Sequence, residues 1–365
     1  MKTELNLLPL ANWGLKHTEQ RPLLIAGPCS AETEEQVLTA AHELAKQNVS
    51  VFRAGIWKPR TRPNSFEGVG SIGLKWLSNV KRETGLKVAT EVANAKHTYE
   101  ALKHNIDVLW IGARTSVNPF AVQEIADALQ GVDIPVFVKN PINPDLELWI
   151  GALERLNKVG ITKLGAIHRG FSSYGDTAFR NAPNWQIPIE LKRRFPELLI
   201  LNDPSHIGGK RSLLFEISQK AMDMDFDGLI IEVHPDPDKA WSDAKQQITP
   251  EQYAELIDSL IIRSKGDAQY VHSKLFDLRK KIDHFDQELV ELLEARMKVA
   301  LEIGEFKREN NMIVLQNNRW SEILEQSIAL GQSKGLSPEL VSKIFKAIHQ
   351  ESINKQTDII NRVFV

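Results

Sequence analysis

Short apolar runs alternate with longer amphipathic stretches along the chain before residue 265. Eight such runs occur, at residues 23–27, 50–55, 87–91, 108–112, 135–139, 163–167, 198–201 and 228–232. Uninterrupted apolar runs of this length are typical of strands that are buried on both faces, as in a parallel sheet with helical crossovers.

Each run is followed by a stretch with the spacing of a helix, which gives eight strand–helix repeats. This order is typical of an α/β protein and predicts a (β/α)8 barrel, also called a TIM barrel. A doubly wound open sheet is the alternative architecture with the same alternation of elements.

Residues 272–308 show helical periodicity only. Apolar side chains recur three or four residues apart there, at Leu278, Ile282, Phe285, Leu289, Leu292, Val299, Ile303 and Phe306. A helix of this extent is roughly 55 Å long at about 1.5 Å per residue. One short neighbour cannot cover such a stripe, so we expect a bundled or dimeric arrangement. Two shorter helices, near 318–330 and 338–362, complete an all-α three-helix module.

Composition changes near residue 265 and marks a boundary between two domains. Sixteen of the 17 prolines and seven of the eight tryptophans precede this point. The stretch 263–270 is polar, contains Gly266 and is typical of a linker. We therefore predict a barrel domain over 1–262, a linker over 263–272 and a helical domain over 273–365.

Charge and cysteine content exclude several classes of protein. The chain has 45 basic and 47 acidic side chains, and its net charge of −2 gives no electrostatic basis for binding nucleic acid or an anionic membrane. No apolar run reaches the roughly 18 to 20 residues of a membrane-spanning helix. Glu4 and Asn6 lie where a secretion signal would be apolar, so we expect a cytoplasmic protein. Cys29 is the only cysteine, which excludes an internal disulfide.

Charged side chains follow nearly every predicted strand. The carboxyl ends of the strands of a (β/α)8 barrel meet at one rim, where the chemistry of such proteins takes place. The cations at this rim are Arg53, Lys58, Arg60, Arg114, Lys139 and Arg169, and other polar groups there are Glu91, His168, Asp203 and His234. Arginine suits bidentate phosphate or carboxylate recognition, and lysine acts as a point charge. Any one of these cations alone fits a surface salt bridge, but together they predict a pocket for substrates with several phosphates and carboxylates.

A second group at the rim has the donor types of a transition-metal site. It consists of Cys29, His206, Glu232 and Asp243. Thiolate, imidazole and carboxylate ligands suit manganese, iron, cobalt or zinc. The spacing is not that of a local metal-binding motif. Burial of Cys29 as a small hydrophobic residue, and a loop position for His206, are the alternative interpretation.

Several short motifs occur in the barrel half in a fixed order. They are Ala26-Gly-Pro-Cys-Ser30, Phe52-Arg53 followed by Lys58-Pro-Arg-Thr61, Ile111-Gly-Ala-Arg114, Val138-Lys-Asn140, Asp203-Pro-Ser-His206-Ile-Gly-Gly and Ile231-Glu-Val-His-Pro235. With these motifs, residues 20–262 resemble the 3-deoxy-D-arabino-heptulosonate 7-phosphate (DAHP) synthase family, in its shorter bacterial Iβ subtype. The resemblance implies a (β/α)8 barrel that condenses phosphoenolpyruvate with erythrose 4-phosphate and releases phosphate, at the entry of the shikimate pathway to the aromatic amino acids.

The resemblance also implies a role for each matching position. Cys29, His206, Glu232 and Asp243 fall on the ligands of a divalent metal, with manganese as the expected ion. Arg53, Lys58, Arg114, Lys139 and Arg169 fall on the phosphoenolpyruvate-binding positions, with Gly112 and Ala113 as nearby backbone. Lys58, Pro59, Arg60 and Thr61 fall on the erythrose 4-phosphate site. Lys58, His206 and Cys29 are the expected catalytic residues.

A related synthase makes the eight-carbon sugar of lipopolysaccharide from arabinose 5-phosphate. It shares the barrel and the Ala-Gly-Pro-Cys element but lacks the Lys-Pro-Arg-Thr element, so this chain is expected to use the four-carbon aldose.

The helical part, 273–365, resembles the all-α chorismate mutase family. Arg279, Arg296, Lys307, Arg319, Ser352 and Gln356 fall on that family's substrate-binding positions. The resemblance implies that chorismate rearranges to prephenate, with Lys307 and Gln356 acting on the ether oxygen. Two positions depart from the family pattern, because Gln316 and Trp320 stand where Asp and Glu are frequent.

Helical geometry places several of these residues relative to one another. Arg296 and Lys307 are eleven residues apart, about three turns, so they share a face of the long helix. Arg296 also lies on the apolar stripe with Leu292 and Val299, where an arginine is costly without an anionic partner. Arg279 points roughly 100° away from Arg296, which fits an arginine that is donated across a dimer. Ser352 and Gln356 are one turn apart and face the same way.

Two interpretations of the helical domain stay open. It is either a working mutase, or mainly a module that binds chorismate or prephenate, dimerises the protein and regulates the barrel. Both can hold, because a bound ligand can shift the arrangement of domains and so inhibit synthesis. We expect feedback to act through this domain, and a homodimer or higher homo-oligomer to form through it.

Overall fold

The computed structural model describes residues 4–16, 22–59, 65–175, 177–263 and 269–361, and only the backbone of 269–273. The chain divides into two compact units, Met1–Arg263 and Ser264–Val365. Strands and helices alternate in the first unit, and the described part of the second is helical. Among the helices described, none combines the length and the apolar character needed to cross a membrane.

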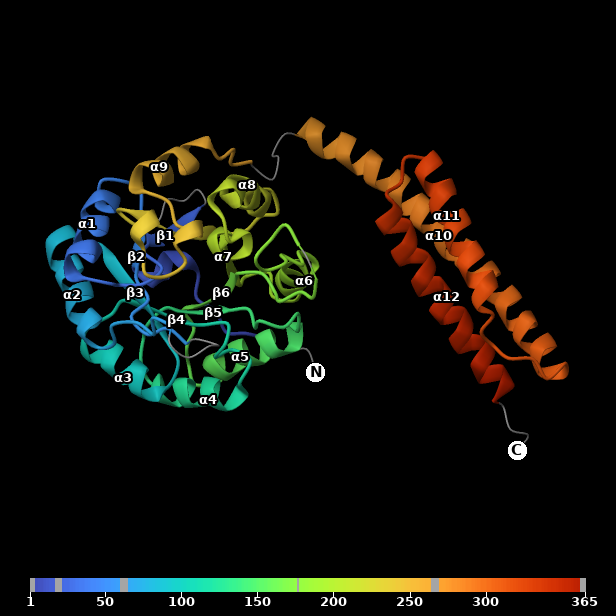
Figure 1. Cartoon of the computed structure of the whole chain (residues 1–365), viewed down its shortest axis with the longest axis horizontal. Coiled ribbons are helices and arrows are strands. Elements are labelled where there is room, and N and C mark those ends of the chain that lie inside the picture. Colours follow the sequence, from blue (N-terminus) through green and yellow to red (C-terminus); the bar gives the residue numbers. More distant parts are fainter. Residues whose placement is uncertain (1–3, 17–21, 60–64, 176, 264–268, 362–365) are drawn as a thin grey trace. The chain divides into compact units, whose positions relative to one another are not determined.

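The first unit is a closed barrel of parallel strands (Figure 1). Its strands are β1 (Leu23–Gly27), β2 (Val51–Arg53), β3 (Lys87–Val92), β4 (Val108–Ile111), β5 (Val136–Lys139), β6 (Leu164–His168), β7 (Leu199–Asn202) and β8 (Gly228–Glu232). Each strand pairs with the next, and β8 pairs with β1 along its whole length. The predicted (β/α)8 barrel is confirmed, and the open-sheet alternative is wrong because the β1–β8 pairing leaves no open edge.

Helices surround the barrel (Figure 1). They are α1 (Glu34–Ala45), α2 (Ile72–Thr84), α3 (Ala95–Lys103), α4 (Pro119–Ala128), α5 (Leu146–Lys158), α6 (Gln186–Arg194), α7 (Pro204–Gly208), α8 (Leu214–Asp223) and α9 (Pro250–Ser259). Four 3-10 turns are also present, η1 (Leu10–Trp13), η2 (Arg211–Leu213), η3 (Pro237–Lys239) and η4 (Ala244–Gln246). Side chains of Thr33, Asn94, Asn118, Asp145 and Thr249 accept hydrogen bonds from first-turn N–H groups. Replacing such a cap by alanine costs about 1 kcal/mol of stability.

Alternate residues of the strands form two separate apolar layers. Phe52 and Leu109 belong to the layer that packs between strands and helices. Val51, Trp110 and Phe137 belong to the layer that fills the inside of the barrel. The alternation is the two-residue period of a strand. Each strand therefore carries its next inward-facing residue at or just beyond its carboxyl end, where the barrel opens.

The amino-terminal end of the barrel is closed by the segment around Trp13. The Trp13 ring lies 5.5 Å from the ring of Phe137, between centroids, and its Nε1 donates to the carbonyl of Leu8 at 2.9 Å. Leu15 belongs to the same inner apolar layer. This end of the barrel is therefore built for stability, as is usual for the fold.

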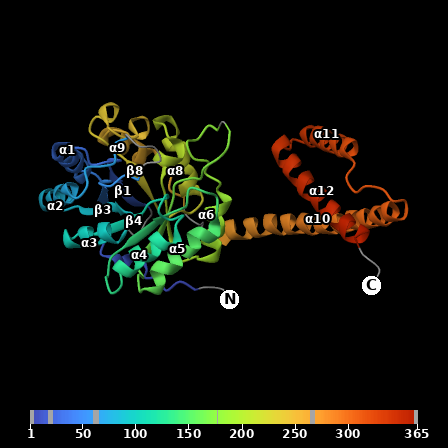
Figure 2. The ribbon, with the colours of Figure 1, turned by 60° about the horizontal axis from the view of Figure 1, so that its bottom comes forward.

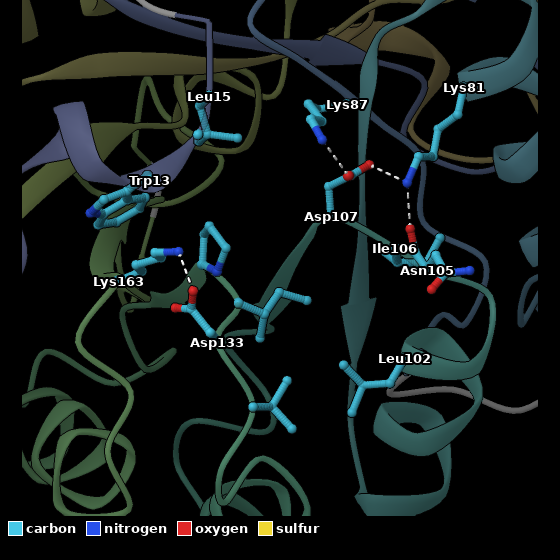
Figure 3. Close-up of a pocket in the computed structure, with 14 residues that line it drawn as sticks. Trp13, Leu15, Lys81, Lys87, Leu102, Asn105, Ile106, Asp107, Asp133 and Lys163 are labelled. Atoms are coloured by element: carbon cyan, nitrogen blue, oxygen red, sulfur yellow. Dashed lines mark hydrogen bonds and ion pairs between the residues drawn. The ribbon is translucent and has the colours of Figure 1, made fainter.

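A cavity of about 380 Å³ opens beside Trp13 (Figure 3). Its charged side chains are paired with one another. Asp107 lies 3.0 Å from Lys81 and 3.0 Å from Lys87, and Lys163 lies 2.7 Å from Asp133. The Lys87–Asp107 and Lys163–Asp133 pairs link the starts of neighbouring strands, so the cavity belongs to the floor of the barrel rather than to its mouth.

The second unit consists of α10 (Gln269–Glu309), α11 (Asn317–Ser333) and α12 (Pro338–Ile360). Figure 2 shows α10 as one unbroken helix. α12 packs against both α10 and α11. Ser337 caps α12, since its side chain accepts a hydrogen bond from the N–H of Leu340. The predicted three-helix module is confirmed. Residues 264–268 of the predicted linker lie outside the described residues.

The apolar stripe of α10 is exposed within the single chain. Leu289 is 57% exposed and Leu292 is 68% exposed, and the other stripe residues are exposed too. Among the side chains of α10 from residue 274 onward, the buried positions are instead Ala300, Gly304 and Lys307. A Cβ added to Gly304 would come within 3.2 Å of the Gln356 backbone, so this glycine lets α12 approach closely.

Candidate active sites

Seven positions at the barrel mouth, all polar except Gly112, continue the inward-facing rows of the strands. Each follows, by two residues, a member of the inner apolar layer. The pairs are Val51 and Arg53, Ala89 and Glu91, Trp110 and Gly112, Phe137 and Lys139, Ile167 and Arg169, Leu201 and Asp203, and Ile230 and Glu232. The two-residue period of a strand thus directs all of these positions to one opening.

Arg53 is the most deeply buried cation of the mouth, with 1% of its surface exposed. Its Nη2 lies 3.4 Å from Oε1 of Glu232 and donates to the carbonyl of Cys29 at 3.2 Å. Its guanidinium carbon lies 4.9 Å from the centre of the Trp110 ring. Nε and Nη1 of Arg53 have no hydrogen-bond partner in the described structure. Buried donors without partners are costly, so this guanidinium is arranged for an added anion.

Lys139, Asp203 and His206 form a buried row beside Arg53. The Nζ of Lys139 donates to Oδ2 of Asp203 at 2.8 Å, and the Nδ1 of His206 lies 2.8 Å from the same oxygen. Burial opposes ionisation of Asp203, but the charges of His206 and Lys139 outweigh it and hold its pKa well below the usual range. Asp203 therefore fixes the His206 ring, and Nε2 of that ring points to Glu232, 3.7 Å from Oε1.

Three of the four predicted metal ligands lie together. One donor atom each from Cys29, Glu232 and Asp243 falls within 4.8 Å of the others. The Sγ of Cys29 lies 3.2 Å from Oδ2 of Asp243, and the Nζ of Lys58 donates to the same sulfur at 3.2 Å. The fourth, His206, is not a member of this cluster, but its Nε2 lies 3.7 Å from Oε1 of Glu232.

Burial and nearby charges together set the protonation of these four groups. It raises the pKa of the Cys29 thiol to about 12, with the charge of Glu232 as a second cause. Burial also lowers the pKa of His206, against the attraction of Asp203 and Glu232. Burial alone would raise the pKa values of Glu232 and Asp243, but the charges of His206 and of neighbouring cations outweigh it and lower both pKa values. The set therefore holds two carboxylates and a protonated thiol.

These residues fit a divalent cation. Oε1 of Glu232 is buried and accepts no hydrogen bond from the described residues. A metal-binding histidine commonly donates its second ring nitrogen to a carboxylate, as His206 does to Asp203. Mixed sulfur, nitrogen and oxygen donors suit manganese, iron, cobalt or zinc. Binding would release the proton of Cys29, because the thiolate is the ligand form.

The remaining predicted positions of the mouth lie around this centre. Arg169 is buried, and its Nη1 donates to Oδ1 of Asn181 at 2.7 Å. Burial lowers the pKa of Arg169 to about 10. Arg114 is exposed and lies close enough to Arg169 to lower that pKa further. Ala113 directly follows Gly112 and is buried, and Pro59 directly follows Lys58 and is half-buried. The predicted aldose ligands Arg60 and Thr61 lie outside the described residues.

Gly112 has a local reason to lack a side chain. A Cβ at this position would collide with the carboxylate of Glu91. Oε2 of Glu91 accepts a hydrogen bond from Nε1 of Trp110 at 3.0 Å. The indole that lies beneath Arg53 is thereby fixed in place.

Two histidines of the predicted rim do not belong to the centre. His168 faces the helical layer, where its Nε2 lies 2.6 Å from the carbonyl of Pro183 and its ring packs against Trp185. His234 is paired with Glu32 at 3.4 Å. His168 directly precedes Arg169, and successive side chains of a strand point to opposite faces. His168 therefore points outward, to the helices.

Sequence reasoning missed Arg180, Gln246 and Gln247. Arg180 lies between β6 and α6, and the two glutamines follow Asp243 in the segment after β8. All three form hydrogen bonds to the candidate metal ligands or to their backbone. The only signal in the sequence was the proximity of the glutamines to Asp243.

The second unit contains a cavity of about 380 Å³ between its three helices. Five predicted positions line it, Arg296, Lys307, Arg319, Ser352 and Gln356. The Nζ of Lys307 donates to Oε1 of Gln356 at 3.0 Å and to the carbonyl of Val314. The Nη1 of Arg296 donates to Oγ of Ser352 at 2.7 Å. Three cations and an amide thus surround one small space, which suits a dicarboxylate.

Arg296 lies on the α12-facing side of α10. The stripe residues Val299 and Ile303 line the same cavity as Arg296. The expectation that Arg296 lies on the apolar stripe therefore agrees with the structure. Arg279 is exposed and is not among the residues that line the cavity.

The two departures from the mutase pattern both line the cavity. Gln316 and Trp320 face it together with His349. The Trp320 and His349 rings are stacked, with centroids 3.8 Å apart. Burial, followed by the charges of Arg296 and Lys307, lowers the pKa of His349, so this wall of the cavity is uncharged at neutral pH.

Known proteins match both units. Residues 13–264 match the DAHP synthetase I family, and residues 278–357 match the family of type II chorismate mutases. A phospho-2-dehydro-3-deoxyheptonate aldolase from Thermotoga maritima is 35% identical, over 65% of this chain and 68% of its own length. A 2-dehydro-3-deoxyphosphooctonate aldolase from Dechloromonas aromatica is 27% identical, over 68% of this chain and 93% of its own.

Solved structures of DAHP synthases are also similar to this chain. A DAHP synthase crystal structure from Thermotoga maritima superposes with a TM-score of 0.58 at 33% identity, covering 65% of this chain and 67% of that one. A truncated form of the synthase from that organism gives 0.56 at 31% identity, with 64% and 83% covered.

The fold and the two sites define an enzyme with two catalytic domains, one a barrel with its site at the carboxyl ends of the strands and one all-helical. The chain belongs to the DAHP synthetase I family and carries a type II chorismate mutase domain in the same polypeptide.

Proposed function

We propose that the barrel condenses phosphoenolpyruvate with erythrose 4-phosphate to 3-deoxy-D-arabino-heptulosonate 7-phosphate and phosphate. The observation that carries this proposal is the buried guanidinium of Arg53, whose Nε and Nη1 have no partner in the part of the chain described. Lys139 and Arg169 lie at the same opening. Several cations around one opening repel each other unless anions bind among them, and phosphoenolpyruvate supplies a phosphate and a carboxylate.

The residues of the mouth orient the two substrates for carbon–carbon bond formation. Arg53, Lys139 and Arg169 hold phosphoenolpyruvate, and their charge offsets the repulsion between two anionic substrates. The enol carbon attacks the aldehyde carbon of the aldose, water adds to the adjacent carbon of phosphoenolpyruvate, and phosphate leaves. Lys58, next to Cys29, is placed to donate a proton to the new alkoxide.

We propose Cys29, His206, Glu232 and Asp243 as the ligands of a divalent metal, with manganese as the expected ion. When bound there, a divalent cation acts as a Lewis acid on the aldehyde carbonyl. The support is the clustering of three donor atoms and the Nε2 of His206, which faces Glu232.

We propose that the helical unit rearranges chorismate to prephenate. This reaction is unimolecular, so the site needs only to hold a compact dicarboxylate and to stabilise negative charge on the breaking ether oxygen. Arg296 and Arg319 suit the carboxylates, while Lys307 and Gln356 suit the ether oxygen. Gln356 needs no proton for this role.

A homodimer would complete the helical site. Arg279 is exposed and outside the cavity of its own chain, and the apolar stripe of α10 is exposed as well. Pairing two copies along this stripe would cover the apolar side chains. It would also allow Arg279 of one copy to reach the cavity of the other.

The alternative for the helical unit is a ligand-sensing module with little mutase activity. Trp320 and Gln316 favour it, because an indole replaces a carboxylate that holds the substrate hydroxyl in the family pattern. We propose that prephenate or chorismate, bound in this cavity, inhibits the barrel in either case.

A dual assay on one preparation tests these functions. Phosphate release from phosphoenolpyruvate should occur with erythrose 4-phosphate and not with arabinose 5-phosphate, and chorismate should be consumed by the same sample. Phosphate release with the five-carbon aldose alone would overturn the assignment of the aldose. Loss of chorismate at the uncatalysed rate would leave only the sensing function.

A further inference from the structure

Two consecutive glutamines after Asp243 are almost fully buried. Gln246 is 1% exposed and Gln247 is 0% exposed. A buried carboxamide is costly unless its donors and its acceptor are all used. The partners of these side chains therefore indicate why the chain buries them beside the candidate metal ligands.

Gln246 lies between a carboxylate and a guanidinium. Its Nε2 donates to Oε2 of Glu232 at 2.6 Å, and its Oε1 accepts from Nη1 of Arg180 at 2.6 Å. The charges of these two partners fix which way the amide points. If the amide were reversed, its oxygen would face the Glu232 carboxylate and its NH2 group would face the Arg180 guanidinium. Glu232 is thus held by Oε2, and its Oε1 remains directed at His206.

Arg180 joins the second carboxylate to the same chain of hydrogen bonds. Its Nη1 also donates to Oδ1 of Asp243 at 2.9 Å. Asp243 has a φ of 51°, a left-handed backbone conformation that is uncommon for a residue with a side chain. The bond from Arg180 helps to hold Asp243 in this conformation, with its Oδ2 on the side of Cys29.

Gln247 acts on the third ligand through the backbone. Its Oε1 accepts from the N–H of Cys29 at 2.9 Å, and its Nε2 donates to the carbonyl of Ser242 at 2.8 Å. The residue that precedes Asp243 is thereby tied to the strand end that carries Cys29.

We propose that Arg180 and Gln246 are positioning residues of the metal site, which orient Glu232 and Asp243 by a continuous chain of hydrogen bonds. The proposal rests on the metal site put forward under the proposed function. Partners of this kind, one step removed from the metal, change metal affinity about 10- to 100-fold when they are removed.

The test compares Co²⁺ binding to chelator-treated full-length protein by calorimetry. Gln246→Met keeps the volume and removes both hydrogen bonds, and we expect the dissociation constant to rise about 10- to 100-fold. Gln47→Met is the matched control, because Gln47 is a partly buried glutamine whose Nε2 bonds to Pro250 at 2.8 Å and makes no contact with the site. Melting temperatures of the metal-free proteins are measured in parallel.

The outcomes separate the two proposals. If the wild-type protein binds no Co²⁺, the metal site itself is wrong. If it binds and Gln246→Met binds equally well, or loses only melting temperature, the positioning role is wrong. Should Gln246→Met fail to fold, Arg180→Lys decides, since it keeps the charge beside Asp243 but cannot bond to both partners. Unchanged affinity in that variant overturns the proposal, and weaker binding supports it.

Discussion

Single residues of the barrel mouth depend on the two-residue period of their strands. Arg53, Lys139 and Glu232 are inward because Val51, Phe137 and Ile230 are inward. An insertion or deletion of one residue within β2, β5 or β8 would turn the functional side chain into the helical layer. The chemistry of the site is therefore tied to the same pattern that builds the core.

At this scale we predict that Cys29→Ala abolishes metal-dependent synthase activity, by about 100-fold or more. The thiolate is the one soft ligand among the four predicted, so its loss weakens binding of a transition metal. Phosphate release is measured as Mn²⁺ is added back to chelator-treated protein. The appearance of a cadmium–thiolate absorption band in the wild type, and its absence in Cys29→Ala, gives a measure apart from turnover. Full turnover by Cys29→Ala in chelator-treated buffer would refute the metal assignment.

A second prediction concerns the pH dependence of the mutase. Burial lowers the pKa of Lys307 from 10.5, and the charged form is the one that stabilises the ether oxygen. Activity should hold at neutral pH and fall as the pH rises through this lowered pKa, because the cation is lost above it. The carboxamide of Gln356 does not titrate, so it causes no fall in activity at acidic pH. The measurement is kcat/KM for chorismate against pH.

Lys307→Arg is the comparison for this profile. In this variant the fall in kcat/KM at alkaline pH should move to a higher pH, since arginine stays charged. An alkaline limb at the same pH in both proteins would show that Lys307 is not the group responsible.

Much of the site could be predicted at the residue scale, and the reason is local. The sequence alone places Arg53, Lys139 and Glu232 at one opening, because each of them ends a strand of the barrel. It could not reveal Arg180 and Gln246, whose function depends on contacts between the loop after β6 and the segment after β8. Such contacts leave no periodic signal in the sequence.

Among the elements, α10 differs most from an ordinary helix. Its buried face packs on α12 through Ala300, Gly304 and Lys307, while the side chains of its apolar stripe are exposed. The period of the stripe predicted the helix well. The same period could not separate the side that packs within the chain from the exposed one, because both carry apolar residues three or four positions apart.

For this helix we predict that Leu289→Glu converts a dimer into a monomer. A carboxylate in the middle of an apolar interface must be desolvated without a partner, which is unfavourable. Light scattering after gel filtration should report twice the chain mass of 41.2 kDa for the wild type and the single mass for the variant. Mutase activity should fall when the dimer is lost, while synthase turnover persists.

Gln287→Glu is the matched control, since it adds the same charge on the opposite, exposed face of α10. A monomeric wild-type protein, or a Leu289→Glu variant that remains dimeric, would contradict the pairing through this stripe.

At the scale of the whole molecule, two compact units lie in one chain, and each holds its own set of converging cations. The barrel and the helical module were both predictable, because each has a single, strong period along the sequence. How one unit influences the other has no such signature, since it depends on a coupling free energy rather than on a local pattern.

We predict that prephenate slows the synthase reaction of the full-length protein by about 5-fold or more at saturation, within the usual range of coupling between sites. The ligand would occupy the cavity of the helical unit and act from there. Initial rates of phosphate release are measured with and without prephenate.

Arg296→Ala serves as the companion variant, because it keeps both units and removes a cation that lines the cavity. It should release phosphate at the wild-type rate and escape inhibition. Equal rates with and without prephenate in the full-length protein, and in a chain that ends at Arg263, would disprove regulation through the helical unit.

The distribution of tryptophans gives each site its own intrinsic fluorophore. Trp110 lies directly beneath Arg53, and Trp320 is the only tryptophan after residue 265 and lines the helical cavity. Indole emission responds to nearby charge and to exclusion of water, so occupancy at either end of the chain changes a different fluorophore. Comparing emission of the wild type with that of Trp320→Phe therefore separates filling of the helical cavity from filling of the barrel, in one cuvette and without any added dye.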